Sequence, residues 1–256
     1  MSRSFAPWST ACARNKQVNE SRYERQMLLP EIGSAGQTKL AAASVLVVGC
    51  GGLGSTLLYD LCSMGVGRIG FCDGDTVSLN NLNRQFLHTP ADIGRRKVQY
   101  AYEKLHAYAP ELTLEPHDMI LTHDNALALV SRYDLVLLAV DSISSRLIAN
   151  RACVTAAKPL VDAGIHGLNG SVYTYRPGKT ACLACFYAEQ IRKKSAPIPS
   201  FAPIVSAISS LEAQCAANIL LGLPNPTGGR MLLFDGASMT TEFVNIAKNP
   251  HCSVCS

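Results

Sequence analysis

The sequence predicts an α/β fold with a doubly wound, mostly parallel sheet and an antiparallel part toward the C-terminus. Short apolar segments alternate with segments of helical spacing between residue 44 and about residue 165, a pattern typical of parallel strands linked by helices. A glycine-rich turn follows the first of these strands, and a segment of alternating polarity follows the series. The 256 residues, 48% of them apolar, are enough to bury a sizeable core.

The spacing of apolar residues predicts each element of the sheet. Segment 21–40, which carries RYERQ, predicts one or two helices, and the valine-rich segment 44–49 predicts the first buried strand. Further strands are expected at 68–75, 112–118, 133–141 and 158–165, and helices at 55–65, 97–109, 125–132 and 143–157. The alternating segment 171–177 predicts a strand in a separate antiparallel part. Right-handed crossovers place the carboxyl ends of the parallel strands at one edge of this Rossmann-like sheet, where ligands bind.

Composition and charge argue against several classes of protein. The net charge of +4 comes from scattered basic residues, so we expect no nucleic-acid partner. No uninterrupted apolar run reaches the roughly 20 residues of a membrane span, so we expect no membrane partner. Residues 1–20 lack the apolar segment of a secretory signal. We expect a disordered extension there, with an organelle transit peptide as the weaker alternative, and a cytoplasmic location.

The sequence GCGGLG, directly after the first strand, fits the pattern G-x-G-x-x-G at Gly49, Gly51 and Gly54. Glycines at these positions permit a tight turn and bring backbone N–H groups close to phosphate at a helix N-terminus. Asp73 follows about 20 residues later, where an acid can accept hydrogen bonds from ribose hydroxyls. The alternative is a tight turn without a ligand. A nucleotide site is the stronger interpretation because strand, turn, helix and acid occur in the required order.

The segment after Asp73 distinguishes between nucleotides. Asp75 falls at the same edge, and polar or cationic side chains follow at Asn80, Asn81, Asn83, Arg84, Gln85, Arg95, Arg96 and Lys97. A triphosphate needs several cationic donors, whereas backbone amides largely suffice for the pyrophosphate of a dinucleotide. The segment therefore favours ATP. A nicotinamide-dependent oxidoreductase is the rival, because it explains the glycines and Asp73, although it leaves this segment unexplained.

Asp141 ends a further apolar strand at the same edge. A carboxylate there can hold Mg²⁺, which takes one or two carboxylates together with phosphate oxygens. The alternative role is an N-cap for the helix expected to begin near Ser144.

Ten cysteines without a secretory signal favour metal or thiol chemistry over disulfides. CLAC contributes Cys182 and Cys185, and HCSVC contributes Cys252 and Cys255. Two C-x-x-C pairs supply four thiolates for tetrahedral zinc, in a structural role because no coordination position is left open. The alternative is two unrelated thiol pairs.

Together these motifs resemble the ThiF/MoeB/HesA proteins, the bacterial relatives of ubiquitin-activating enzymes. The resemblance rests on SRYERQ, GCGGLG, DGDTVSLNNLNRQF, the Lys97 helix, VDS, CLAC and HCSVC, in this order over about residues 21–256. It implies one adenylation domain, with a nucleotide-binding part (21–165) and a zinc-containing, carrier-binding part (166–256). It implies a homodimer that uses ATP and Mg²⁺ to adenylate the C-terminal glycine carboxylate of a small ubiquitin-like sulfur-carrier protein. Such carriers end in Gly-Gly and serve thiamine or molybdopterin biosynthesis or related sulfur transfer.

The resemblance also implies roles for individual residues. Asp73 would bind the ribose, and Asp141 would bind Mg²⁺. Arg25, of the RxxRQ motif, would reach the ATP of the partner subunit. The residues that would bind phosphates are Gly52 with the other glycines of the turn, Asn81, Arg84 and Lys97. The expected catalytic residues are therefore Arg25, Arg84, Lys97 and Asp141, and the four paired cysteines would bind zinc.

Two features depart from the family pattern. Ser142 follows Asp141 where the family often has asparagine, and because serine can still donate a hydrogen bond to the nucleotide we expect a small change. The loop after CLAC lacks the cysteine that many members carry, and Cys215 is expected to pack inside an apolar helix. No rhodanese-like sequence accompanies the motifs, so a separate sulfur donor is expected. The proline-rich segment 191–203 is expected to lie over the carrier's tail. Adenylation of a peptide or another carboxylate is the alternative within the family.

Overall fold

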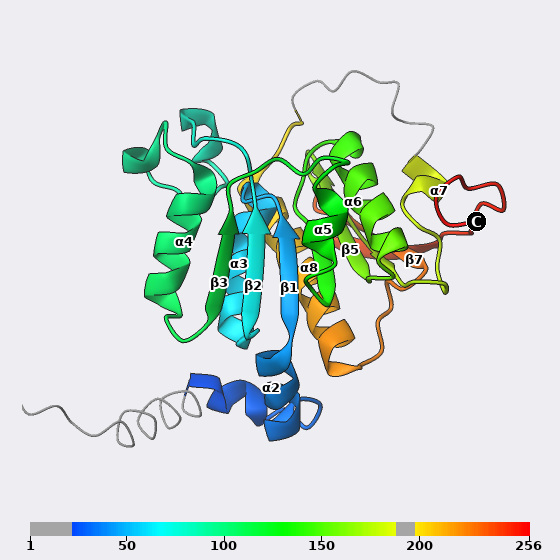
Figure 1. Ribbon diagram of the computed structural model, residues 1–256, viewed down its shortest axis with the longest axis horizontal. Coiled ribbons are helices and arrows are strands. Elements are labelled where there is room, and N and C mark those ends of the chain that lie inside the picture. The colour runs from blue at the N-terminus through cyan, green and yellow to red at the C-terminus, as the bar shows by residue number, and fades with distance from the viewer. Residues whose placement is uncertain (1–21, 188–197) are drawn as a thin grey trace, which may run out of the picture.

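The computed structural model describes residues 22–187 and 198–256. They form one eight-stranded sheet with helices on both faces (Figure 1). The expected extension at 1–20 and most of the proline-rich segment lie outside the described residues. The strands are β1 (Ser44–Val48), β2 (Arg68–Cys72), β3 (Thr113–His117), β4 (Leu135–Leu138), β5 (Leu160–His166), β6 (Asn169–Tyr175), β7 (Arg230–Asp235) and β8 (Thr240–Asn245).

The helices follow the strands much as the apolar spacing predicts. Residues 22–27 are helical, and the longer helices are α2 (Gly33–Ala42), α3 (Gly52–Met64), α4 (Lys97–Tyr108), α6 (Ile143–Thr155) and α8 (Ala202–Leu221). The short ones are α5 (Ala126–Val130), α7 (Ala184–Tyr187) and the 3₁₀ turns η1 (Leu79–Asn81) and η2 (Pro90–Asp92). The helix predicted at 97–109 therefore begins at the expected residue.

The strand order is β3-β2-β1-β4-β5-β6-β7-β8, and the strands from β3 to β5 pair in parallel. The strand expected at 171–177 overlaps β6, which ends at Tyr175, and is antiparallel as predicted. It pairs with β5 along its whole length, so the antiparallel strands continue the same sheet and do not form a separate part. The reason is a two-residue turn at Gly167, whose φ of 64° suits the tight reversal of a hairpin.

Successive residues of the central strands supply two cores, one on each face of the sheet. Val45 and Val47 face the core under α3, α4 and α8, whereas Leu46 and Val48 face the core under α5 and α6. This alternation explains why β1 is buried at every position, as expected for a parallel strand covered on both faces.

Helix α8 packs against α3, β5 and β6. Its 20 residues meet the length and mean hydropathy of a membrane span, although the sequence has no uninterrupted apolar run of that length. Since 56% of the span is buried inside the domain, core packing accounts for its apolar character.

The chain leaves β1 toward β2 on one side and later returns to β4 on the other side. The carboxyl ends of β1 and β4 therefore mark the point where the strand order reverses, where sheets of this kind bind ligands. In Figure 1 the tip of the β1 arrow marks this edge of the sheet, and the β2 and β3 arrows point the same way, away from α2.

Candidate functional site

A cavity of about 480 Å³ lies at this reversal point, within the range of roughly 300–1,000 Å³ typical of small-molecule sites. Residues that follow β1, β2, β3 and β4 line it. Those expected from the sequence are Gly49, Gly51, Gly52, Asp73, Asp75, Arg84, Gln85, Lys97 and Asp141. The described end of the proline-rich segment adds Ile198 and Ser200. The fold thus brings most of the predicted site residues to one place.

The glycine turn connects β1 to α3, and the backbone leaves no room for a side chain at Gly49 or Gly54. Gly49 has a φ of 104°, and a Cβ on Gly54 would lie 2.1 Å from the Gly49 carbonyl oxygen. Gly54 therefore permits close packing of α3 on β1 and does not line the cavity. Helix α3 starts at Gly52 without a side-chain cap, so the first N–H groups of the helix are free to bind an anion.

Asp73 and Lys97 lie beside this turn. The Asp73 carboxylate accepts hydrogen bonds from the backbone N–H groups of Cys50 and Asp75, both at 2.8 Å. Each oxygen keeps lone-pair capacity for a further donor. The Lys97 ammonium is nearly buried, 3.1 Å from Asp75 Oδ2 and 3.9 Å from Asp73 Oδ2. One cation and two carboxylates are thus held at the wall of the cavity.

Arg84 enters the cavity from the loop after β2, and two asparagines hold it there. Its Nη1 donates to the Asn80 carbonyl oxygen at 3.0 Å and to Asn83 Oδ1 at 2.7 Å. Asn81 Oδ1 accepts from the Ser78 N–H and completes a capping box for η1. The three asparagines do not line the cavity; they order the loop that presents Arg84.

The cavity has an apolar wall and a buried polar atom that lacks a partner among the described residues. Met119, Ile120 and Leu121, directly after β3, form the apolar wall with Cys72. Gln85 is buried, and its Oε1 has no hydrogen-bond partner within the described residues. A buried carbonyl oxygen without a hydrogen-bond donor lowers the stability of the fold. Such an unpaired atom is expected where a side chain contacts a polar ligand.

Asp141 is free to bind a ligand because the neighbouring serine caps α6. The helix begins at Ile143, and the Ser142 hydroxyl oxygen accepts from the Ser145 N–H at 3.1 Å. The Ser142 hydroxyl in turn donates to Ser145 Oγ at 2.7 Å. Asp141 is therefore not the N-cap, and Ser142 is engaged in the cap and does not line the cavity.

Arg25 lies at the opposite end of the domain. The adjacent Gln26 donates to the carbonyl oxygen of Met64, the last residue of α3, at 2.9 Å. The cavity lies at the first residue of the same 13-residue helix, and such a helix is about 20 Å long. That length exceeds the reach of an arginine side chain, so Arg25 cannot enter the cavity of its own chain.

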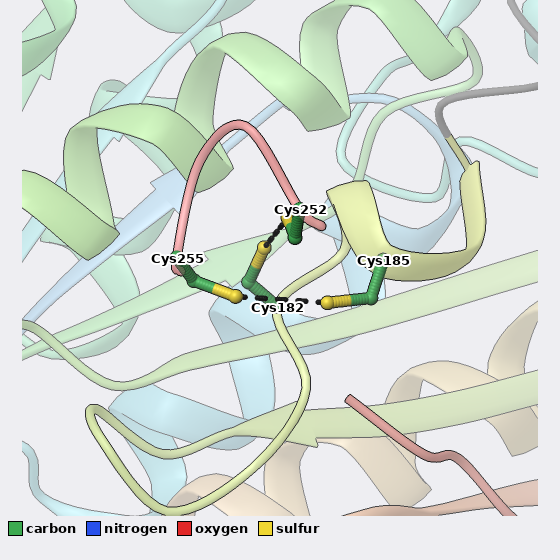
Figure 2. A group of neighbouring side chains, drawn as sticks. All are labelled: Cys182, Cys185, Cys252 and Cys255. Atoms are coloured by element: carbon green, nitrogen blue, oxygen red, sulfur yellow. Dashed lines mark hydrogen bonds between the residues drawn. The ribbon is translucent and has the colours of Figure 1, made fainter. Parts of the chain in front are cut away.

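The four paired cysteines form one cluster, with their sulfur atoms within 4.8 Å of one another (Figure 2). Cys182 and Cys252 are 3.7 Å apart, and Cys185 and Cys255 are 3.6 Å apart. A disulfide needs about 2.05 Å, whereas tetrahedral Zn–S bonds of about 2.3 Å place sulfur atoms about 3.8 Å apart. The geometry of the cluster therefore fits a bound metal ion and does not fit two disulfides.

The surroundings of Cys252 favour the ionised form of its thiol. Burial opposes its ionisation, but backbone hydrogen bonds from Val254 and Cys255 and the neighbouring thiols lower its pKa to about 7. Ionised thiols are the form that binds a metal. Cys215 lies elsewhere, buried on α8, with its sulfur 3.3 Å from Thr227 Oγ1, and burial raises its pKa. It packs in the core, as the sequence predicts.

Sequence reasoning missed Arg146, which lines the cavity although it is buried. A single arginine in a predicted helix is usually solvated, so only its position shortly after Asp141 could have drawn attention to it. The apolar wall at 119–121 was missed for a similar reason, because a short loop has no periodicity to interpret.

Comparison with known proteins places this geometry in a family. The ThiF family model matches residues 23–254. The chain belongs to the ThiF family. A sulfur carrier protein adenylyltransferase of Thermus thermophilus is 36% identical over 91% of this ThiF-family chain and 90% of that protein.

Two further relatives extend the comparison. The adenylyltransferase and sulfurtransferase MOCS3 of Anopheles gambiae is 40% identical over 92% of this chain but 55% of that protein, so the chain spans about half of its length. Among solved structures, E. coli MccB with ATP is 26% identical, with a TM-score of 0.80 over 92% of this chain and 73% of that chain.

Proposed function

We propose that this ThiF-family protein is an ATP-dependent adenylyltransferase that activates the C-terminal glycine carboxylate of a small ubiquitin-like sulfur-carrier protein. One observation carries the proposal: a single cavity holds an uncapped helix N-terminus, the cations Arg84 and Lys97, and the free carboxylate of Asp141. The relatives named adenylyltransferases favour ATP over the nicotinamide alternative.

The cavity has an apolar end at residues 119–121 and a polar end at the start of α3, and these two ends favour one orientation of ATP. The adenine packs against the apolar wall at 119–121, and Asp73 accepts hydrogen bonds from the ribose. The phosphates meet the N–H groups at the start of α3, with Arg84 and Lys97 beside them. The unpaired Gln85 Oε1 gains a polar partner. Asp141 holds Mg²⁺, which neutralises phosphate charge when bound.

The reaction needs little acid–base chemistry from the protein. A carboxylate with a pKa near 4 is already ionised at pH 7, so it can attack the α-phosphorus in line while pyrophosphate leaves. Positioning and charge neutralisation supply the catalysis. Arg84 and Lys97 stabilise the negative charge that shifts onto the pyrophosphate.

A homodimer completes the site in this proposal. Arg25 lies about one helix length from the cavity of its own chain, so it can contribute only to the cavity of a second copy. Exposed Leu28 and Leu29, near Arg25 in the chain, suit burial against that copy.

Zinc is the metal we propose for the cysteine cluster, in a structural role, because four thiolates leave no open coordination position. We also propose a separate sulfur donor. Among the described residues, Cys72 is the one cysteine that lines the cavity, and burial raises its pKa to about 12. It therefore stays a thiol and does not act as a nucleophile.

The test is ATP–pyrophosphate exchange with a panel of carrier proteins ending in Gly-Gly. A carrier-dependent exchange that Asp141→Ala removes, with the fold intact by circular dichroism, is the expected result. Exchange with short peptides but not with carriers would support the peptide alternative instead. Exchange with neither, or heat protection by NADH but not by Mg-ATP, would contradict the proposal.

A further inference from the structure

Arg146 joins the cavity wall to the interior of the domain. Its Nη2 donates to the Val140 carbonyl oxygen at 2.7 Å and to the Ala163 carbonyl oxygen at 2.9 Å, and its Nη1 pairs with Asp162. Val140 directly precedes Asp141. The guanidinium therefore fixes the backbone from which the Asp141 carboxylate projects into the cavity.

Asp162, in turn, has a second partner from the metal-binding part of the chain. Its Oδ1 pairs with Arg146, and its Oδ2 accepts a hydrogen bond from the Tyr187 hydroxyl at 3.2 Å. Tyr187 is the last residue of α7, two residues after the cluster ligand Cys185. The phenol thus connects the cysteine cluster to the buried ion pair.

A second contact ties the cluster to the same helix. Asn150 lies on α6 four residues after Arg146, so both occupy one face of the helix. Its Oδ1 accepts from the Leu183 N–H at 2.8 Å, and its Nδ2 donates to Cys182 Sγ at 3.5 Å. The cysteine-bearing loop is therefore fixed on α6 next to the residue that lines the cavity.

We propose that Tyr187, fixed by the four-cysteine cluster, is a positioning residue for Asp141 and acts through Asp162 and Arg146. The cluster then does more than stabilise the fold: it sets the geometry of the Mg²⁺-binding carboxylate. This inference deepens the proposed function and rests on it, because it assigns Asp141 to Mg-ATP.

The test compares Tyr187→Phe with Tyr173→Phe as the matched control. Both variants lose one phenol hydroxyl near the cluster. Tyr173 lies opposite Asp162 across the β5–β6 pair, but its hydroxyl donates to the Ala181 carbonyl oxygen at 2.8 Å and, among the described residues, makes no hydrogen bond to Asp162. Metal content is measured in each purified protein and is expected to equal that of the wild type. The rings and their packing are retained, so both variants are expected to fold.

The first measurement is the Mg²⁺ concentration required for half-maximal binding of a non-hydrolysable ATP analogue. We expect Tyr187→Phe to raise it about five- to tenfold, the scale of the net contribution of one typical intramolecular hydrogen bond, and Tyr173→Phe to leave it unchanged. Analogue binding without Mg²⁺ is expected to be equal in all three proteins. An Asp141→Asn variant is expected to show no further loss when Tyr187→Phe is added, because both changes act on one carboxylate.

The second measurement needs no nucleotide. Hydrogen–deuterium exchange of the peptide covering residues 139–146 is expected to be faster in Tyr187→Phe than in Tyr173→Phe. If the wild type binds Mg-ATP but the two variants have equal Mg²⁺ requirements or equal exchange, the positioning role is wrong and the proposed function stands. Full additivity with Asp141→Asn would also overturn it. If the wild type binds no Mg-ATP, the proposed function fails and the role of Tyr187 fails with it.

Discussion

Replacing Glu212 with glutamine tests how the core accommodates a buried acid. Glu212 lies on α8 with 0% of its surface exposed, and neither carboxyl oxygen makes a hydrogen bond of good geometry within the described part of the chain. Burial raises the pKa of this carboxyl well above its ordinary value, and the positive charge of Arg146 opposes the shift only in part. Glutamine has nearly the same shape and is neutral at every pH, so Glu212→Gln removes the ionisation and keeps the packing.

The sign of the effect follows from proton binding. In the unfolded chain a glutamate titrates near pH 4.3, so above that pH the folded state holds a proton that the unfolded state has lost. The free energy of unfolding of the wild type therefore falls as the pH rises from about 4 toward the folded pKa, by at most about 1.4 kcal/mol per pH unit. Between pH 5 and pH 7, the glutamine variant should gain up to about 2.7 kcal/mol over the wild type.

The assay is urea unfolding of both metal-loaded proteins at pH 5, 6, 7 and 8 and constant ionic strength. The difference between their free energies of unfolding should widen with pH in favour of the variant. Glu242→Gln, on the exposed strand β8, controls for the loss of one negative charge. A difference that stays constant over this pH range would refute the reasoning, because it would mean that Glu212 ionises equally in the folded and unfolded states.

Three further predictions concern the glycine turn, the metal cluster and the dimer. Gly54→Ala places a Cβ 2.1 Å from a backbone oxygen and should lower the free energy of unfolding by more than about 3 kcal/mol. Gly94→Ala is the control, because its φ is 84° but nothing lies within 4 Å of the added Cβ, and it should cost about 1–2 kcal/mol. Thermal unfolding of the two variants checks this difference. Cys255→Ser should lose the metal by elemental analysis and lower the melting temperature by about 5–10 °C; a variant that keeps its metal and its melting temperature contradicts the cluster. Arg25→Ala and Asp141→Ala should each be inactive alone, but mixing the two proteins should restore about a quarter of wild-type pyrophosphate exchange. Half of the dimers formed after subunit exchange contain both variants, and each mixed dimer has one complete site of two. No recovery of exchange activity would argue against a shared site.

The sequence predicts this fold well where a local pattern has one physical cause. The burial of β1 on both faces produces its run of valines, and the absence of space around Gly49 and Gly54 requires glycine at both. The same holds for the cysteines, because C-x-x-C spacing reflects coordination geometry. In each case only one type of residue satisfies the structural requirement, so the requirement can be inferred from the sequence alone.

Prediction is weaker where the role of a residue depends on which neighbour takes a competing role. Either Asp141 or Ser142 is chemically suited to cap α6, and only the structure shows that the serine does so and leaves the carboxylate free. The asparagines after β2 have side chains suited to phosphate, but Asn80 and Asn83 instead bind Arg84. A sequence identifies such groups of polar residues without showing how the roles are divided among them.

The expected boundary at residue 165 divides elements that the structure joins most closely. Strand β5 is parallel to β4 on one side and antiparallel to β6 on the other, so it belongs to both expected parts. It also carries Asp162, whose two oxygens bind Arg146 from the nucleotide side and Tyr187 from the metal side. Because one strand and one buried carboxylate serve both parts, we expect a change at the cysteine cluster to reach the cavity through three hydrogen-bonded side chains, those of Tyr187, Asp162 and Arg146. The continuous sheet is thus the physical basis of the coupling that we propose between the cysteine cluster and the cavity.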